Sequence, residues 1–503
     1  MAKLLISILF VFISNILSAE IKIGWASDDI TPDKPMILQG QFYARVSEGI
    51  MDPVTSTVLA IESNRAGITR KVMMISCDLG RIDDDLKNRI RGLIIKDIPE
   101  LMPENIILNA THTHAAPSCG PEKNLANIYG VDLPALSPFE CMEYVARKVR
   151  DAAVKAWTTR KPGGISFGLE HAVLSHNRLV VNYAGNAAMY GKTIDPEFSH
   201  FEGYEDHSVN LLFTWDMNKE LTGIIVNVPV PSQVSEHIFK VSADLWYDVR
   251  MELNGRLGKQ VHILPQCSAA GDQSPHILVN QAAEERMQHI TGRDSTKQGL
   301  RKQISSRITT AVMSVYPYMK DNIEWDPTVA HFSEKTDLPR RMISDADLDK
   351  AMKEFQIWEP QYKELLNKAN NDPEFKKDPH WYRDLTNAYS KMRRGTIVRE
   401  RLELQKTKPV IPVEIHVLRI GDIIIATNPF ELYLDYGMRI KGRSPAIQTF
   451  IVQLSGGGTY LPPLRSTLGG SYGAEAASTD IGPEGGKILV ERTLEIINTL
   501  FKE

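Results

Sequence analysis

Hydrophobic positions follow two periodicities along the chain, and the two alternate from one segment to the next. Short apolar runs between turn residues predict buried strands, at residues 20–24, 58–63, 71–77, 106–108, 164–169, 210–215, 223–228, 261–264 and 448–454. Apolar positions three and four residues apart predict helices, at residues 83–94, 137–157, 243–257, 295–315 and 487–501. Such alternation is typical of an α/β (mixed α+β) fold, and it returns at residues 413–428.

One long segment departs from this order. Residues 344–406 are charged and helical in periodicity, with breaks expected at Pro360, Pro373 and Pro379. We therefore expect an inserted helical subdomain at about 344–406. Its aromatic side chains either bind a polar, sugar-like ligand or pack the small core of the insertion itself; they are Trp358, Tyr362, Trp381, Tyr382 and Tyr389.

Composition and charge narrow the class of protein. Of the 503 residues, 43% are hydrophobic and 24% are charged, which is ordinary for a globular protein. The chain is long enough to bury at least one large core. The formal net charge of −4 gives no indication of nucleic acid as a partner. The oligomeric state does not follow from the sequence.

The first 19 residues have the pattern of a secretory signal peptide. Lys3 precedes an apolar run over residues 4–17, and Ser18-Ala19 offers a small-residue cleavage site before Glu20. The run is short for a membrane span, although a membrane anchor is the alternative interpretation. No later segment is apolar enough to span a bilayer. We expect residues 1–19 to be removed and residues 20–503 to be exported, to the periplasm or outside the cell.

The cysteines do not form a metal-binding pattern. The chain has no CxxC pair, so a thiolate zinc site is not indicated. Export would permit disulfide bonds, and the sequence leaves open whether any form among Cys77, Cys119, Cys141 and Cys267. Cys77 lies in a strand-like run and is expected to be a small buried hydrophobic residue.

Two histidines stand at the end of the strand predicted at 106–108. They belong to the stretch Asn-Ala-Thr-His-Thr-His at 109–114. If the backbone stays extended there, the side chains of His112 and His114 point to the same face. One neutral imidazole is a good ligand for a transition metal, and a second beside it can carry protons near neutral pH. The alternative is a pair of ordinary loop histidines.

A second candidate stretch follows the strand at 261–264, and its small residues would let the backbone approach a ligand closely. Ser274, in a tight turn after a strand, is well placed as a nucleophile, with Asp272 two residues earlier to orient it or its base. The alternative is a helix cap, because serine at the N-cap followed by Pro275 at the first helical position is a common helix start.

Two further candidates lie near the end of the chain. Glu431 follows the very apolar run 423–426, and open α/β sheets place their sites at the carboxyl ends of buried strands. The alternative is a carboxylate in the first turn of a helix from Leu432, where the helix dipole favours it. The glycine-rich stretch 456–475 lacks the context of a phosphate-binding loop.

Taken together, these stretches resemble the neutral/alkaline (non-lysosomal) ceramidase family. The resemblance rests on Asn-Ala-Thr-His-Thr-His at 109–114, His-Asn-Arg at 176–178, Gly-Asp-Gln-Ser-Pro at 271–275, Asn-Pro-Phe-Glu at 428–431, Thr-Tyr at 459–460 and Gly-Pro at 482–483. It covers most of the chain after residue 19, with poor coverage at 344–406. It implies a ceramidase-like catalytic domain with mixed sheets and flanking helices, in a divergent member of the family.

The resemblance also implies a zinc-dependent amide hydrolase and assigns roles to residues. His112, Glu431 and Tyr460 would be zinc ligands, and His114 a neighbouring proton carrier. Ser274, supported by Asp272, would be the nucleophile or a group that positions the attack. Arg178 would contact the substrate oxygen or the developing oxyanion. Zinc polarises a carbonyl group or lowers the pKa of water, and an imidazole can move the proton.

One position departs from the family pattern. The second histidine ligand of ceramidases follows the strand that corresponds to residues 223–228, and the matching residue here is Pro231, which cannot bind metal. His237 lies six residues later and could substitute if the loop folds back. Without it, one nitrogen and two oxygen ligands remain, so an oxygen-preferring cation or no metal are alternatives to zinc.

Three interpretations of function follow. The first is an exported metal-dependent hydrolase that cleaves an amide (N-acyl) or related bond. The second is a carbohydrate-processing enzyme on the same scaffold, because ceramide needs a long apolar groove, whereas aromatic residues amid charges suit a sugar-like ligand at least as well as two acyl tails. The third is a non-catalytic binding protein that has lost the metal. The substrate is a small molecule, a lipid or a glycan, and the sequence does not name it.

Overall fold

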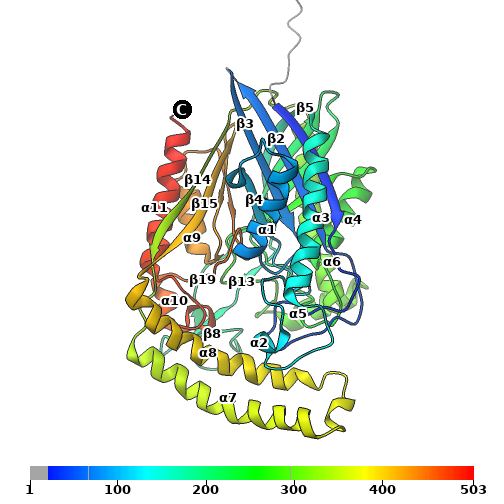
Figure 1. Ribbon diagram of the computed structural model, residues 1–503. Coiled ribbons are helices and arrows are strands. Elements are labelled where there is room, and N and C mark those ends of the chain that lie inside the picture. The colour runs from blue at the N-terminus through cyan, green and yellow to red at the C-terminus, as the bar shows by residue number, and fades with distance from the viewer. Residues whose placement is uncertain (1–20, 66, 295, 503) are drawn as a thin grey trace, which may run out of the picture.

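Two β-sheets packed face to face form the centre of the molecule (Figure 1). The computed structural model describes residues 21–65, 67–294 and 296–502, so the predicted signal peptide lies outside the described residues. The larger sheet has the order β12-β11-β10-β5-β1-β2-β3-β4 and the smaller one β14-β15-β16-β18. Apolar side chains of both sheets meet in one core, with Ile61 and Ile225 from the larger sheet and Phe450 from the smaller. Burying such side chains between the layers supplies the main driving force of folding.

The strands of the two sheets lie close to the segments that the apolar runs predict. The larger sheet contains β1 (Ile21–Asp29), β2 (Thr55–Arg65), β3 (Ile68–Cys77), β4 (Ile106–Ala110), β5 (Lys161–His171), β10 (Ser208–Asp216), β11 (Leu221–Val228) and β12 (His262–Cys267). The smaller sheet contains β14 (Val329–Pro339), β15 (Val410–Ile420), β16 (Ile423–Thr427) and β18 (Gln448–Val452). Strand β14 was not predicted, because most of its residues after Ala330 are polar or half-exposed.

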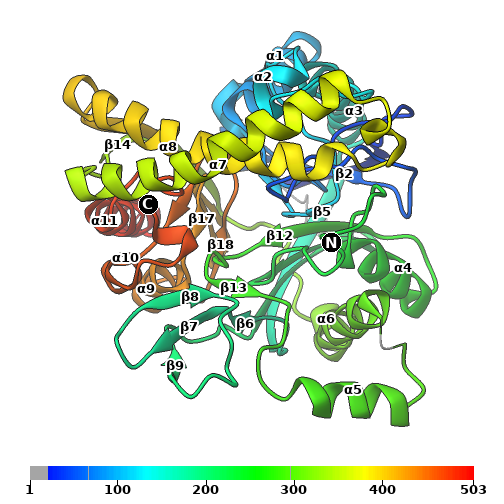
Figure 2. The ribbon, with the colours of Figure 1, turned by 90° about the horizontal axis from the view of Figure 1, so that it is seen from below.

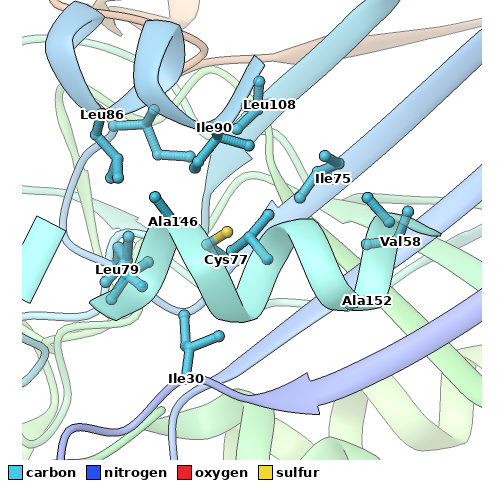
Figure 3. Close-up of a cluster of buried hydrophobic side chains, with 14 of the residues drawn as sticks. Ile30, Val58, Ile75, Cys77, Leu79, Leu86, Ile90, Leu108, Ala146 and Ala152 are labelled. Carbon is cyan, nitrogen blue, oxygen red and sulfur yellow. The ribbon is translucent and has the colours of Figure 1, made fainter. Parts of the chain in front are cut away.

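Helices cover the outer face of each sheet and complete a four-layer arrangement. On the larger sheet lie α1 (Asp84–Asp97), α3 (Pro138–Thr158), α4 (Leu245–Leu257) and α6 (Lys297–Met319). On the smaller sheet lie α9 (Leu434–Arg443) and α11 (Pro483–Leu500). Figure 3 shows Ala146 and Ala152 of α3 against Cys77 and neighbouring side chains of the larger sheet. The predicted mixed α/β fold with flanking helices is confirmed.

Helix α3 starts where its sequence predicts. Ser137 accepts a hydrogen bond from the backbone N–H of Glu140, and the Glu140 side chain accepts one from the backbone N–H of Ser137. Pro138 occupies the first helical position, where its missing N–H costs nothing. This reciprocal capping fixes the start of a 21-residue helix, and the helix in turn holds the strands that lead to the candidate site.

Two long helices of residues 345–407 form a hairpin across the lower end of the molecule in Figure 1, the end that faces the viewer in Figure 2. These are α7 (Asp345–Asn371) and α8 (Tyr382–Thr407), where a helical insertion was expected. The expected break at Pro360 is wrong, because α7 continues through it. The break between the helices falls at residues 372–381 instead, which include Pro373 and Pro379. No described helix of the protein has both the length and the apolar character that crossing a membrane requires.

The hairpin aromatic residues dock the hairpin onto the body. The hydroxyl of Tyr362 donates to the carbonyl of Gly130, and that of Tyr389 donates to the carbonyl of Asn127. Tyr382 is buried beside Ile37 and accepts a hydrogen bond from the backbone N–H of Val46. Trp358 lies under Lys391, and Trp381 packs on Tyr382. The three tyrosines thus differ from the expected packing of the insertion's own core, because they bind the body, whereas Trp358 contacts the insertion itself.

The remaining strands and helices are short and lie at the carboxyl ends of the sheet strands. They are β6 (His176–Asn177) with β13 (Gln273–Ser274), β17 (Glu431–Leu432) with β19 (Tyr460–Leu461), the three strands β7 (Leu179–Asn182), β8 (Ala187–Met189) and β9 (Phe198–Phe201), and helices α2 (Leu125–Tyr129), α5 (Gln281–Ile290) and α10 (Leu464–Gly469). All four cysteines are buried and free. Burial raises the pKa of the Cys77 thiol to about 12, which agrees with a packing role for it.

Candidate functional site

Most of the predicted site residues line one cavity of about 640 Å³ at the carboxyl ends of β4, β11, β16 and β18, whereas Asp272 and Ser274 are not in its lining. Three pairs of these strands and their neighbours run parallel, β3 with β4, β11 with β12 and β16 with β18, so loops from distant parts of the sequence meet at one edge. The lining includes Gln39, Tyr43, His112, His114, Arg178, Tyr190, Gln233, Glu236, His237, Glu431, Tyr460 and Tyr472.

The two histidines meet through a turn and not through an extended strand. Strand β4 ends at Ala110, and His112 has a φ of 66°, in the left-handed region that few non-glycine residues adopt. The His112 and His114 rings lie edge to face with centroids 4.9 Å apart, and their Nε2 atoms are 3.4 Å apart. The expectation that an extended backbone aligns these rings is therefore wrong in its mechanism, although the rings do meet.

A glycine makes the close packing around His114 possible. Gly40 has a φ of 103°, and a Cβ atom at this position would lie 2.4 Å from the Cβ of His114. Any other residue would be strained in this backbone conformation and would collide with the imidazole. The loop of residues 38–43 can therefore close over the histidine turn.

The tautomer of His112 is fixed by the backbone. Its Nδ1 lies 2.6 Å from the carbonyl oxygen of Gly80, which only accepts hydrogen bonds, so Nδ1 carries the hydrogen. The Nε2 of His112 is left with its lone pair, 3.5 Å from Oε2 of Glu431. This is the arrangement in which a histidine binds a metal, with the second nitrogen held by a backbone carbonyl.

Glu431 and Tyr460 lie side by side on two short parallel strands. They are paired residues of β17 and β19. Burial alone would raise the pKa of Glu431, but His112, Tyr460 and Arg178 outweigh it and lower the pKa to about 2. Glu431 precedes α9, which begins at Leu434, so the alternative of a carboxylate in the first helical turn is wrong. His112, Glu431 and Tyr460 thus converge on one site, as we expected.

Arg178 connects the two tyrosines of the cavity. It follows β6 and is buried, and its two terminal nitrogens donate to the hydroxyls of Tyr190 and Tyr460, each at 3.3 Å. One of these nitrogens also donates to the carbonyl of Gly271 at 2.8 Å. The guanidinium therefore reaches the cavity mainly through two phenol groups.

Ser274 lies on β13, and the helix-cap alternative for it is wrong because the next helix begins at Gln281. The side chain is fully buried. Its Oγ accepts hydrogen bonds from the Tyr190 hydroxyl at 3.1 Å, the Gln233 side chain at 3.3 Å and the backbone N–H of His276 at 3.1 Å. Three donors on one oxygen favour negative charge on it.

Asp272 holds the surrounding loops in place. Its carboxylate accepts hydrogen bonds from the Asn177 side chain at 2.9 Å and from the backbone N–H of Leu434 at 3.0 Å. Both carboxylate oxygens are thus engaged on β6 and at the start of α9. Asp272 acts on Ser274 through the loop that carries both residues.

The loop after β11 supplies a carboxylate that the sequence reasoning missed. Oε2 of Glu236 lies 3.3 Å from Nδ1 of His114, and its Oε1 lies 3.0 Å from Nε2 of His276. Burial opposes ionisation of Glu236, but its contacts with His114 and His276 lower the pKa well below its usual range. The only signal in the sequence is its place in a loop at a strand end.

His237 lies apart from the proposed metal ligands. Its side chain is 62% exposed, and it lies 3.6 Å from Glu236 and 3.4 Å from the Tyr43 hydroxyl. The loop that carries Pro231 therefore directs Gln233 and Glu236 toward the cavity centre. His237 is at the rim of the cavity.

One buried nitrogen indicates that a cation fits this site. Nδ1 of His114 has no hydrogen-bond partner, although Glu236 lies 3.3 Å away, because the contact does not have hydrogen-bond geometry. If His114 donates from Nε2 to the lone pair of His112, its Nδ1 is a bare acceptor facing a carboxylate. A cation on Nε2 of His112 would free His114 to carry its hydrogen on Nδ1 and to donate it to Glu236. Burial lowers the pKa of His114 to about 4, so it is neutral at pH 7.

The donor set is small for a metal site. Within residues 21–502, leaving aside 66 and 295, no group of three or more His, Cys, Asp or Glu side chains is arranged to hold a metal ion. The third donor here is the phenol oxygen of Tyr460, which is not one of these residue types. One nitrogen and two oxygen donors fit an open catalytic site better than a closed structural one.

Comparison with known proteins supports the fold that the sequence resemblance implies. No protein-family model and no curated protein matches the sequence. Among solved structures, a neutral ceramidase from Pseudomonas aeruginosa matches with a TM-score of 0.68 at 16% identity, over 96% of this chain and 75% of that one. A ceramidase complexed with C2 matches with a TM-score of 0.65 at 15% identity, over 96% and 76%. At this identity the comparison shows that the chain has the ceramidase fold.

Proposed function

We propose that this protein is a metal-dependent hydrolase that cleaves an amide (N-acyl) or related carbonyl bond in the 640 Å³ cavity. The observation that carries the proposal is the meeting of His112 and Glu431, 3.5 Å apart and 319 positions apart in sequence, beside Tyr460 and Arg178. Burying charged groups together costs solvation free energy. A cluster of titratable groups with shifted pKa values, in a cavity at strand ends, is typical of an active site.

The proposed metal ligands are His112, Glu431 and Tyr460, with zinc as the favoured ion. When bound, the metal would polarise the substrate carbonyl and lower the pKa of water. His112 is oriented by Gly80, and Glu431 is ionised at neutral pH because its pKa is about 2. We leave His237 out of the set because of its exposure and its contacts with Glu236 and Tyr43.

The remaining residues supply proton transfer and substrate orientation. His114 is neutral at pH 7, and with its Nδ1 toward Glu236 its Nε2 is free to accept a proton in the cavity. Ser274 acts as the nucleophile or as a group that positions the attack, with Asp272 fixing its loop. Arg178 stabilises the developing oxyanion through the hydroxyl groups it binds.

The test is hydrolysis of a panel of N-acyl compounds by the purified protein. The panel contains long-chain ceramides, short-chain N-acyl amines and N-acetylated sugars, each assayed with and without a chelator, and bound metal is measured in parallel. We expect turnover of at least one N-acyl compound, its loss after chelation and its recovery on adding zinc. Turnover of none together with no bound metal would favour the binding protein that has lost the metal, and cleavage of a glycosidic bond alone would favour the carbohydrate-processing enzyme.

Export is part of the proposal. A signal peptide at residues 1–19 would carry the enzyme to the periplasm or outside the cell, consistent with the pattern of those residues. N-terminal sequencing of the mature protein should start at or near Glu20. Recovery of intact Met1 from a membrane fraction would contradict it.

A further inference from the structure

Among the hydroxyl groups that are hydrogen-bonded around Ser274, the one nearest to the substrate cavity belongs to a tyrosine. Ser274 is fully buried and does not line the cavity, whereas Tyr190 is half-buried and lines it. The Tyr190 hydroxyl donates to Ser274 Oγ at 3.1 Å, so the phenol is the member of this pair that the cavity reaches. A substrate carbonyl would meet Tyr190 before it could approach Ser274.

Two donors polarise the Tyr190 hydroxyl. Arg178 donates to its oxygen at 3.3 Å, and the Gln233 side chain donates to it at 3.2 Å. A phenol that accepts hydrogen bonds from a guanidinium and an amide becomes a stronger donor itself, because each bond draws electron density from its O–H. Arg178 also donates to the Tyr460 hydroxyl, so a single guanidinium links the Tyr190 hydroxyl to one of the proposed metal ligands.

The backbone holds Tyr190 in a conformation that is rarely adopted. Its φ is 55°, and its N–H donates to the carbonyl of Arg178 at 2.8 Å. Left-handed backbone at a non-glycine residue costs on the order of 1 kcal/mol or more, and it is retained where the surroundings enforce it. Here it turns the ring at the end of β8 toward the cavity, where it lies edge to face with His276.

We infer that Tyr190 is a further catalytic residue, whose hydroxyl turns its single hydrogen from Ser274 to the substrate oxygen on which negative charge develops. Ser274 and Gln233 are positioning residues that hold this hydroxyl, and Arg178 polarises it. The inference rests on the proposed function, since only an attacked carbonyl develops that charge. Of the two roles proposed for Ser274, the inference selects the positioning one, because the buried serine does not line the cavity.

The first experiment compares two single-atom deletions on a substrate that the wild-type protein hydrolyses. Tyr190→Phe should lower kcat by about 100- to 1,000-fold with little change in KM, which is the usual loss for one oxyanion donor. Ser274→Ala should lower kcat by only about tenfold, as for the loss of one positioning hydrogen bond. The matched control is Tyr183→Phe, on the same three-stranded sheet region, whose side chain is 73% exposed.

The opposite order of effects would overturn the inference. If Ser274→Ala abolishes turnover while Tyr190→Phe retains most of it, Ser274 is the reacting group. An acyl group found on Ser274 after rapid quenching and peptide mass spectrometry would lead to the same conclusion. Thermal unfolding of each variant shows whether a loss of activity comes from a loss of folded protein.

A second experiment does not depend on turnover. An aryl sulfonyl fluoride reacts with accessible tyrosine and serine hydroxyls, and peptide mapping identifies the residue modified. We expect labelling of Tyr190 in the wild-type protein, distinguished by fragment ions from labelling of the exposed Tyr183 on the same peptide, and loss of the modification at position 190 in Tyr190→Phe. Labelling of Ser274, or of neither residue, would overturn the inference. Labelling of Tyr190 in a protein that hydrolyses none of the N-acyl panel would contradict the proposed function alone.

Discussion

Two clusters in this molecule contain the same residue types and differ in how completely their contacts are satisfied. The cavity has His112, His114, Glu431 and Arg178. A second cluster, which we call the inter-sheet cluster, has His331, His416, Glu414 and Arg91. It lies on β14, β15 and α1. Residue type therefore does not distinguish an active site from a structural cluster in this protein.

The inter-sheet cluster is closed by hydrogen bonds. His331 and His416 stack at 3.2 Å between ring nitrogens, and Nε2 of His416 lies 2.8 Å from Glu414. Arg91 binds both carboxylate oxygens of Glu414, at 2.7 and 3.1 Å. The far nitrogen of His331 lies 3.2 Å from the side-chain oxygen of Asn105. Each polar group has a partner, so the cluster has no vacant donor or acceptor for a ligand.

The cavity cluster keeps vacant positions. The contact between His112 and Glu431 is 3.5 Å, longer than a hydrogen bond between such groups, and the Nδ1 atom of His114 has no partner. Unsatisfied buried groups cost stability unless something completes them. Incomplete satisfaction next to a cavity, and not the presence of two histidines and a glutamate, therefore indicates function here.

The largest effect on stability should come from breaking the inter-sheet cluster. Glu414→Ala leaves Arg91 buried without its carboxylate, so we expect the free energy of unfolding to fall by about 3–5 kcal/mol. Urea unfolding of the purified variant measures this. A change below about 1 kcal/mol would mean that the cluster is not structural.

The corresponding change in the cavity should affect activity. Glu431→Gln keeps the shape of the side chain and removes its charge, so we expect turnover to fall by roughly a hundredfold or more and bound metal to decrease. The free energy of unfolding should change by less than it does in Glu414→Ala, because the contact between Glu431 and His112 is not a buried ion pair of full strength. Wild-type metal content together with wild-type activity would exclude Glu431 from the site.

A pH titration of stability should detect the inter-sheet histidines. Burial lowers the pKa of His331 to about 3, from about 6.5 in the unfolded chain. The neutral folded form is fully favoured above pH 6.5, and this contribution is lost as the pH falls from 6.5 toward 3, because only the unfolded chain takes up the proton. In His331→Asn the slope of unfolding free energy against pH in this range should decrease, by up to about 1.4 kcal/mol per pH unit. An unchanged slope would contradict the assignment.

The smallest effect is expected at the rim of the cavity. His237→Ala removes a side chain that is 62% exposed and contacts Glu236 and Tyr43, so turnover should change by less than about threefold and metal content should not change. A loss of metal that added zinc restores would show instead that the loop folds back and that His237 is a ligand.

Most of the secondary-structure elements follow from local sequence. Apolar periodicity predicted the strands of the larger sheet and β18 to within a few residues, because buried strands are rich in apolar residues, whereas β15 and β16 were expected only as one segment of returning α/β order at 413–428. The short motifs singled out His112, His114, Ser274 and Glu431 as candidates because each follows such a strand, and the family resemblance added Tyr460. Pro360 was misjudged, because tertiary contacts along α8 keep α7 helical through it.

Which groups face each other follows from the packing of the sheets and not from any local pattern. Tyr190, Gln233 and Glu236 carry no local signal, because they are polar residues in loops, where polar residues are expected. Their roles come from loops that parallel strands bring to one edge of two sheets, and from Arg178, whose guanidinium joins two phenols 270 positions apart in sequence. Local sequence determines the conformation of a segment, whereas hydrogen-bond partners distant in the chain depend on the packing of the sheets.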